Sequence, residues 1–159
     1  MKLQKQKLVL SFLILLPAIP LSAQVEKVAM RTTGISCGFC AGLSELSFRR
    51  VPGVDKVAIS LPKEAIMLSY KPGAAFDPTG IRKILEPLKV GVVEFQISAR
   101  GRVEEKSGKK FFRASKYLFA LTAVPKSPAI PSNIPMIIEG ILNDRSNPME
   151  VRVLSFKTL

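Results

Sequence analysis

The stretch that decides the fold spans residues 34–40 and reads Gly34-Ile35-Ser36-Cys37-Gly38-Phe39-Cys40. Cys37 and Cys40 are the only cysteines of the chain, and the sequence contains no histidine. Soft-metal or redox chemistry therefore depends on this one pair of thiols. Two thiolates on one turn can hold a single soft cation such as Cu(I) or Hg(II), or they can close into a disulfide.

The hydrophobic pattern around the cysteines predicts alternating strands and helices. The expected order is a strand at 28–32, a helix from Cys37 to Arg50, strands at 57–61 and 66–70, a helix from Asp77-Pro78 to about Pro87, and a strand at 93–97. In the first helix, Phe39, Leu43 and Leu46 define the apolar face. This order predicts an α+β fold, a ferredoxin-like βαββαβ sandwich in which four strands back onto two helices.

The chain resembles a heavy-metal-associated domain in three places: residues 34–40, the segment Val51-Pro52-Gly53-Val54 and the hairpin at 57–70. This is the small fold of copper chaperones, of the N-terminal modules of copper-pumping ATPases and of the periplasmic mercury-binding protein of mercury-resistance systems. The resemblance covers residues 24–97. It implies that Cys37 and Cys40 are the metal ligands and that residues 34–36 shape the loop.

Two positions depart from the pattern of this family. Ile35 stands where the family usually has a methionine packed beneath the metal loop. Val92 stands where bacterial members often carry a tyrosine, in the turn Lys89-Val90-Gly91-Val92. The resemblance implies that a residue of this turn lies near the sulfurs, and Lys89 is the candidate. These departures leave the metal preference open.

Cysteine binds metal as the thiolate, and a helix N-terminus favours this anion through its free N–H groups and its dipole. A free thiol has a pKa of ~8.5, which such surroundings bring to roughly 3.5–7.5. Thiolates prefer Cu(I) to magnesium or calcium, and a closed zinc site takes four ligands. We therefore expect Cu(I), with Hg(II) or another soft metal ion as the alternative. Two ligands leave room for a partner's cysteine, so we expect trafficking or detoxification and not storage.

Other interpretations of the pair stay open: a disulfide, a thiol oxidoreductase, or a folded module that no longer binds metal. The rival function is a binding or assembly module in which Cys37 and Cys40 form a disulfide and a basic β-domain docks an acidic partner. The sequence has no histidine for a triad, no phosphate-binding glycine loop and no paired carboxylates at recognisable spacing. It therefore predicts a binding protein and not an enzyme.

Residues 1–23 have the pattern of a secretory signal peptide. Three lysines precede an apolar core at residues 8–16, and Leu21-Ser22-Ala23 offers a cleavage site before Gln24. The apolar stretch is shorter than the roughly 20 residues of a spanning helix, and an uncleaved anchor is the alternative. We expect export to the periplasm or the extracellular space. Cleavage would leave 136 residues with a formal charge of +9.

Residues 98–159 are predicted to form a small all-β domain, separate from the domain at residues 24–97. Strands are expected at 100–105, 110–115, 117–123, 136–142 and 149–156, with Gly101 bending the first and a proline-rich loop after the third. Five short strands with a glycine bend resemble an OB-type barrel. The alternative is an extension that completes a sheet with the first domain or with another chain.

Positive charge is concentrated in this second region. Lysine and arginine outnumber aspartate and glutamate by 11 to 5 in residues 98–159, and by 10 to 7 in residues 24–97. A nucleic-acid platform could be built from Lys106, Lys109, Lys110, Arg113 and Lys116 with Phe111, Phe112 and Tyr117. An exported protein rarely meets nucleic acid, so we favour a solvated hairpin face with Phe111 or Phe112 packed inward. The expected partners are a soft metal ion and a metal-transporting membrane protein or acidic protein.

Overall fold

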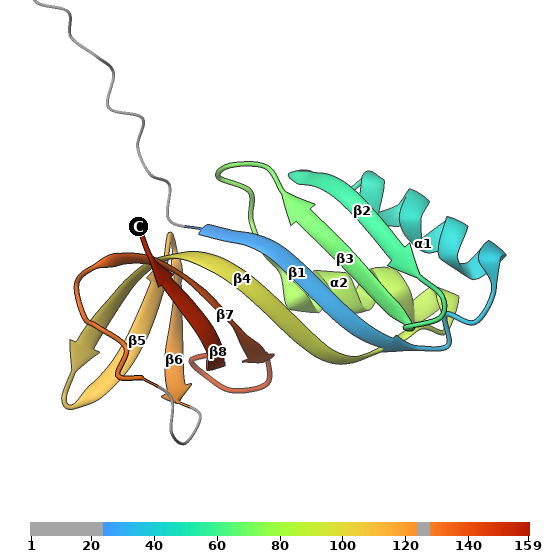
Figure 1. The fold of residues 1–159 in the computed structure, drawn as a ribbon. Helices are drawn as coiled ribbons and strands as arrows, with labels where there is room; N and C mark the ends of the chain where they lie inside the picture. The colour runs from blue at the N-terminus through green and yellow to red at the C-terminus, as the bar shows by residue number, and fades with distance from the viewer. Residues whose placement is uncertain (1–23, 124–127) are drawn as a thin grey trace, which may run out of the picture.

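The computed structural model describes residues 24–123 and 128–159, which form one continuous eight-stranded sheet with two α-helices (Figure 1). The elements are β1 (Gln24–Thr33), α1 (Gly38–Arg49), β2 (Val54–Ser60), β3 (Ala65–Tyr70), α2 (Pro78–Leu85), the 3-10 helix η1 (Glu86–Leu88), β4 (Gly91–Lys106), β5 (Lys109–Ala114), β6 (Tyr117–Ala123), β7 (Pro135–Asn143) and β8 (Glu150–Thr158). The order from β1 to β4 confirms the predicted βαββαβ arrangement. The predicted signal peptide and residues 124–127 of the proline-rich loop lie outside the described residues. In the part of the chain that the structure describes, no helix is long and apolar enough to cross a bilayer.

The first four strands form an antiparallel layer in the order β2-β3-β1-β4, and α1 and α2 cover one of its faces (Figure 1). Period-two alternation places every second residue of a strand on the helix side. The side chains buried there include Val28, Met30, Phe48, Ile66, Leu68, Leu85, Phe95 and Ile97. As predicted, α2 begins with a proline at its first position, but the Asp77 side chain makes no capping hydrogen bond.

The predicted apolar face of α1 is wrong. Phe39 is 75% exposed and Leu46 is 48% exposed, whereas Ser44 and Phe48 are buried. Two features explain the rotated helix. Phe48 fills the space over the sheet, and the buried Ser44 hydroxyl donates to the Cys40 carbonyl at 2.9 Å, so the small polar residue costs little on the inner face. Counting apolar residues could not detect a buried serine.

The second half of the sheet curls into a closed ring of strands. β4 pairs with β5 and with β7, and the ring runs β4-β5-β6-β8-β7 and back to β4. The pairing of β6 with β8 is parallel, and the other pairings are antiparallel. This five-stranded barrel buries Phe112, Phe119, Met136, Ile138 and Val151 in its interior. Four of the five predicted strands are confirmed, with small shifts of their ends, and the first, expected at 100–105, is the second half of the longer strand β4.

β4 is the strand that the two halves share. Phe95 and Ile97 face the helices, and Ala99 and Val103 face the barrel interior. All four follow the same period-two alternation and are buried. The boundary expected between residues 97 and 98 lies inside this strand, and the division of the chain into two domains stays a prediction.

Gly101 marks the point where β4 changes partners. β1 pairs with β4 as far as Arg100, and β5 pairs with it from Arg102 onward. A Cβ atom on Gly101 would lie 2.0 Å from the Arg113 carbonyl oxygen, so only glycine lets β5 cross this close.

Aromatic side chains close the junction of the two halves. Phe76, which follows β3, packs edge-on against Tyr70, Phe95 and Tyr117. The Phe76 backbone N–H also donates to the Tyr117 hydroxyl at 2.8 Å. The barrel is therefore packed against the N-terminal region and does not hang from a linker.

Candidate metal centre

The two cysteines lie where the sequence places them, in the loop after β1 and in the first turn of α1. Cys37 is the N-cap residue of the helix, and its Sγ accepts a hydrogen bond from the Cys40 backbone N–H at 3.1 Å. The Cys37 carbonyl accepts the next N–H, from Ala41, at 3.0 Å. A sulfur at this position faces the unpaired N–H groups and the positive end of the helix dipole. The site therefore favours a negative charge on Cys37.

The structure pairs Cys37 with Cys40 in a disulfide, and their Cα atoms are 5.3 Å apart. This is the oxidised form of the pair. A disulfide sulfur carries no thiolate charge, so metal binding requires prior reduction to two thiols. Among the described residues, no group of three or more cysteine, aspartate or glutamate side chains is arranged to hold a metal ion.

The loop rests on buried neighbours. Ile35, a residue of the loop itself, is fully buried. Thr32, at the end of β1, donates from its backbone N–H and from its hydroxyl to the Glu64 carbonyl, at 2.7 and 2.8 Å. These contacts fix the end of the strand from which the loop leaves.

The turn before β4 forms a second support. Gly34 has φ +85, and a Cβ atom on it would lie 2.5 Å from the Lys89 carbonyl oxygen. Glycine is required here both by the left-handed backbone and by the close approach. Lys89 therefore reaches the loop through its backbone, while its side chain is exposed. Its predicted role beside the sulfurs stays a prediction.

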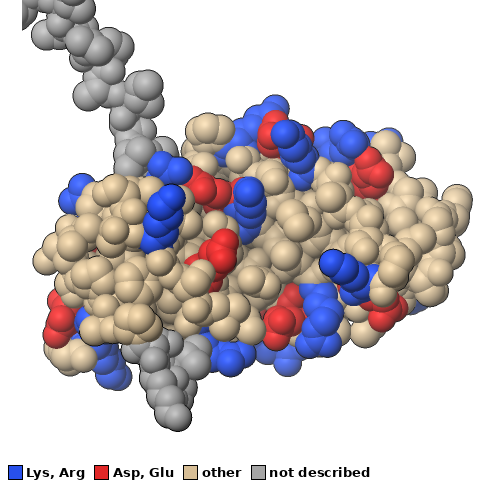
Figure 2. Space-filling model, in the orientation of Figure 1, with Lys and Arg blue, Asp and Glu red and all other residues tan. Residues whose placement is uncertain are grey.

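The segment that carries the cysteines has no charge of its own. Residues 32–44 contain no acidic or basic side chain, and the end of the molecule at which α1 begins is tan on the face that Figure 2 shows. The exposed Lys89 side chain belongs to the turn that touches this segment. Phe39 projects from this end between the two cysteines. In the described structure the barrel lies at the opposite end, so it does not cover the site (Figure 1).

The residues proposed for a nucleic-acid platform do not come together as one surface. Phe112 is buried in the barrel, and Tyr117 packs against Phe76. Arg113 is bound to Glu104 through two hydrogen bonds, and the pKa of the Glu104 carboxyl is lowered by this partner. Phe111 alone of the three aromatic residues remains on the outer side. The expectation that Phe111 or Phe112 packs inward is confirmed for Phe112.

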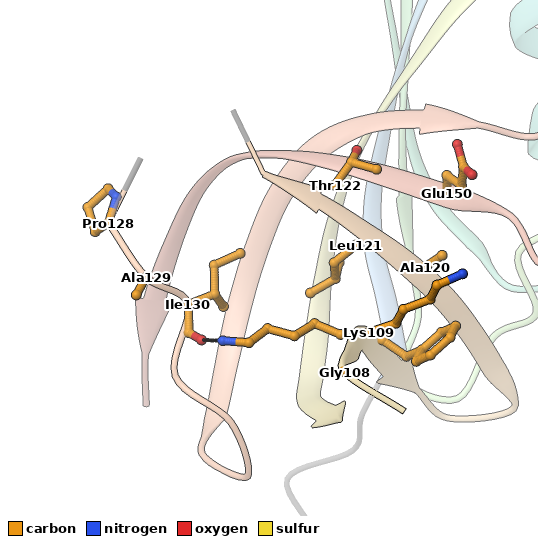
Figure 3. Close-up of a pocket in the computed structure, with 11 residues that line it drawn as sticks. Gly108, Lys109, Ala120, Leu121, Thr122, Pro128, Ala129, Ile130 and Glu150 are labelled. Carbon is orange, nitrogen blue, oxygen red and sulfur yellow. Dashed lines mark hydrogen bonds between the residues drawn. The ribbon is translucent and has the colours of Figure 1, made fainter. Parts of the chain in front are cut away.

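The barrel has a pocket of about 620 Å³ at one end, shown in Figure 3. Apolar side chains of Phe111, Leu121 and Ile130 line it, and Lys109, Lys110, Thr122 and Glu150 are its polar groups. The Lys110 ammonium donates to the Ile130 carbonyl, the contact drawn as a dashed line, and this bond ties β5 to the segment after residue 128. The pocket is far from the cysteines.

No family model matches the sequence. No curated protein matches it either. Solved structures do match. The CopZ metallochaperone is 19% identical, with 42% of this chain and 98% of that chain covered and a TM-score of 0.39. The N-terminal domain of PacS from Synechocystis is 21% identical over 42% and 92%, with a TM-score of 0.36. A copper-bound CopA variant from Bacillus subtilis is 28% identical over 44% and 91%, with a TM-score of 0.37. These matches agree with the resemblance of residues 34–40 to heavy-metal-associated domains. They leave the C-terminal region of this chain unassigned.

One group of interactions was not predicted from the sequence. Arg82 in α2 donates from Nε and Nη2 to the two carboxylate oxygens of Asp144, at 2.9 and 3.0 Å, and from Nη1 to the Val92 carbonyl at 2.8 Å. The sequence pattern marks Asp144 only as a turn residue. Because Arg82 and Asp144 are 62 positions apart, no local pattern connects them.

Proposed function

We propose that this chain binds one soft metal ion, Cu(I) or Hg(II), through the reduced thiols of Cys37 and Cys40, with Cu(I) as the expected ion. The observation that supports this most directly is the position of both sulfurs in the first turn of α1, with Cys37 at the N-cap. Two thiolates around Cu(I) leave a net negative charge, which the positive end of the helix stabilises. Soft sulfur ligands select Cu(I) over hard cations.

The binding step follows from the oxidation state. An external dithiol reduces the disulfide by thiol–disulfide exchange and is itself oxidised to a disulfide, which leaves free thiols at Cys37 and Cys40; metal binding then releases the thiol protons. Cu(I) bound by two sulfurs keeps positions open to a third ligand. Because the cysteine segment is exposed and carries no charged side chain of its own, a cysteine of a partner protein can enter and take the ion. We propose metal trafficking or detoxification as the purpose, with a metal-transporting membrane protein as a partner.

Thiol titration before and after reduction tests this function. Reduced protein, held without oxygen, should show two reactive thiols that disappear when one equivalent of Cu(I) is added. Oxidised protein should bind none. A disulfide that resists reductant, or thiols that stay reactive in the presence of Cu(I), would contradict the proposal.

Export through residues 1–23 is also a proposal. It is supported by the start of the fold, since Gln24 follows the expected cleavage site, is buried and accepts a hydrogen bond from the Gly73 backbone N–H. Sequencing the N-terminus of secreted protein should give Gln24 as the first residue. Retention of residues 1–23 would favour a membrane anchor.

We further propose that the barrel is of the OB type. The ring order β4-β5-β6-β8-β7 with one parallel pair is the support for it, because a five-stranded Greek-key barrel has such an arrangement. The rival function uses this region: a stable Cys37–Cys40 disulfide and a barrel that docks an acidic partner. The disulfide present in the structure favours it. Binding of an acidic protein that is unaffected by reduction or by Cu(I) would support this rival.

A further inference from the structure

The metal loop is supported by a turn whose position depends on the barrel. The turn at residues 89–92 touches the loop at Gly34, where the Lys89 carbonyl leaves no room for a side chain. Its next residues continue this contact, since Val90 is buried and Gly91 pairs with Thr33 in the sheet. A shift of this turn therefore shifts Gly34, three residues before Cys37.

Arg82 holds the end of this turn. Its Nη1 donates to the Val92 carbonyl at 2.8 Å, beside the irregularity where the pairing of β1 with β4 shifts between Arg31 and Thr32. The guanidinium also lies over the Phe95 ring, 4.9 Å from its centroid. An arginine side chain has many rotamers, so one hydrogen bond and one ring contact leave it several orientations.

Asp144 restricts this freedom. Its carboxylate accepts from Nε and Nη2 of Arg82, and this two-pronged geometry fixes the plane of the guanidinium. The carboxylate is only 12% exposed, and the arginine side chain is 31% exposed, so water competes weakly for the pair. Asp144 belongs to the turn between β7 and β8 and therefore comes from the barrel.

We infer that the barrel is a brace for the metal loop, with Arg82 as the positioning residue and Asp144 as the residue that orients it. The inference rests on the proposed function of Cys37 and Cys40. Metal binding to two ligands requires that both sulfurs be held at one spot. A loop that is already held in place spends less of the binding free energy on ordering. The barrel thus contributes to metal affinity although it lies far from the sulfurs.

Competition between the reduced protein and a chromogenic Cu(I) chelator tests the brace in the full chain. Asp144→Ala should weaken Cu(I) binding by about three- to tenfold, the usual size of coupling between distant sites. Glu26→Gln is the matched control, because it breaks another partly exposed ion pair, with Arg100, that does not touch the turn. This control should bind Cu(I) within about twofold of the parent.

A double variant separates this role from a general loss of stability. If Asp144 acts through Arg82, Arg82→Gln with Asp144→Ala should bind no more weakly than Arg82→Gln alone. Parent-like affinity of Asp144→Ala, or effects of the two changes that multiply, would overturn the inference.

Hydrogen exchange in the metal-free protein gives a readout that does not depend on copper. The amides of Gly34, Val90 and Val92 should exchange faster in Asp144→Ala than in Glu26→Gln. Equal exchange in the two variants would overturn the brace. A parent that binds no Cu(I) but shows the expected exchange would instead refute the proposed function and leave the brace standing.

Discussion

The N-terminal region and the barrel bury their apolar faces in different ways. In the first, strands β1 to β4 have one face covered by α1 and α2, and the other face meets solvent. In the second, the sheet closes on itself, and Phe112, Phe119 and Met136 fill the interior without any helix. The shared strand β4 passes from one arrangement to the other with the same face buried from Phe95 to Val103. The difference teaches that two architectures can share a single core when one long strand serves both.

If the core is shared, damage in the barrel should reach the helices. Phe119→Ala removes a fully buried ring that stacks on Tyr117, and it should cost about 3–5 kcal/mol of unfolding free energy. Denaturation followed by residue-specific hydrogen exchange should show equal loss of protection in β6 and in α1. Loss confined to the barrel would break the comparison, since the two parts would then unfold independently. Phe39→Ala, at an exposed position, is the control and should change stability by less than about 0.5 kcal/mol.

The change of partners along β4 can be tested at Gly101. Gly101→Ala places a Cβ atom against the Arg113 carbonyl oxygen and should cost about 1–3 kcal/mol, because the backbone of β5 must move. Gly42→Ala is the contrast within the N-terminal region. Nothing lies within 4 Å of a Cβ atom there, so in helix α1 this change should stabilise by about 0.5–1 kcal/mol. Thermal unfolding measures both, and a tolerated Gly101→Ala would contradict the close approach.

The ion pair between the two parts makes stability depend on pH. Arg82 holds the pKa of the Asp144 carboxyl below its usual range. The pair therefore stabilises the fold above the ordinary pKa of an aspartate, and this contribution is lost as the pH falls through the lowered, folded-state pKa. Asp144→Asn should cost about 1–2 kcal/mol at neutral pH, and the difference from the parent should shrink in acid. Urea unfolding at several pH values measures it. A difference that does not change with pH would contradict the assignment. Asp55→Asn, at an exposed position in β2, is the control and should leave the free energy of unfolding almost unchanged at every pH.

The smallest effect is expected on the surface of α1. Glu45 and Arg49 form an exposed i,i+4 pair at 2.7 Å. Glu45→Gln should lower the free energy of unfolding by about 0.3–0.5 kcal/mol, and this difference from the parent should vanish in high salt. A larger cost in urea unfolding would mean that this face of α1 is less exposed than the structure indicates.

Local patterns predicted most of the secondary structure. Alternation marked the strands, and Pro78 marked the start of α2 because proline fits the first helical turn. What they missed depends on contacts between distant residues. The inner face of α1 follows Ser44 and Phe48, which the sheet selects, and not the apolar triplet. The length of β4 was also not predicted, because Gly101 was interpreted as a bend. In the structure the strand continues through this residue.

The candidate site shows the same division. The hydrophobic pattern predicted the place of Cys37 and Cys40 at the start of a helix, since a strand pattern precedes them and a helical pattern follows. The Arg82–Asp144 pair could not be predicted, because only the folded barrel brings that turn to α2. The oxidation state of the cysteines also depends on the surroundings of the protein, so their spacing does not predict it.

Copper titration of three reduced proteins tests the central claim most directly: the parent, the double variant Cys37→Ser with Cys40→Ser, and the α1 surface control Glu45→Gln. We predict one Cu(I) per chain for the parent and for the control, and no chelator-resistant Cu(I) for the double variant. Circular dichroism should show the same fold in all three. Equal copper uptake by the double variant and the parent would contradict the account.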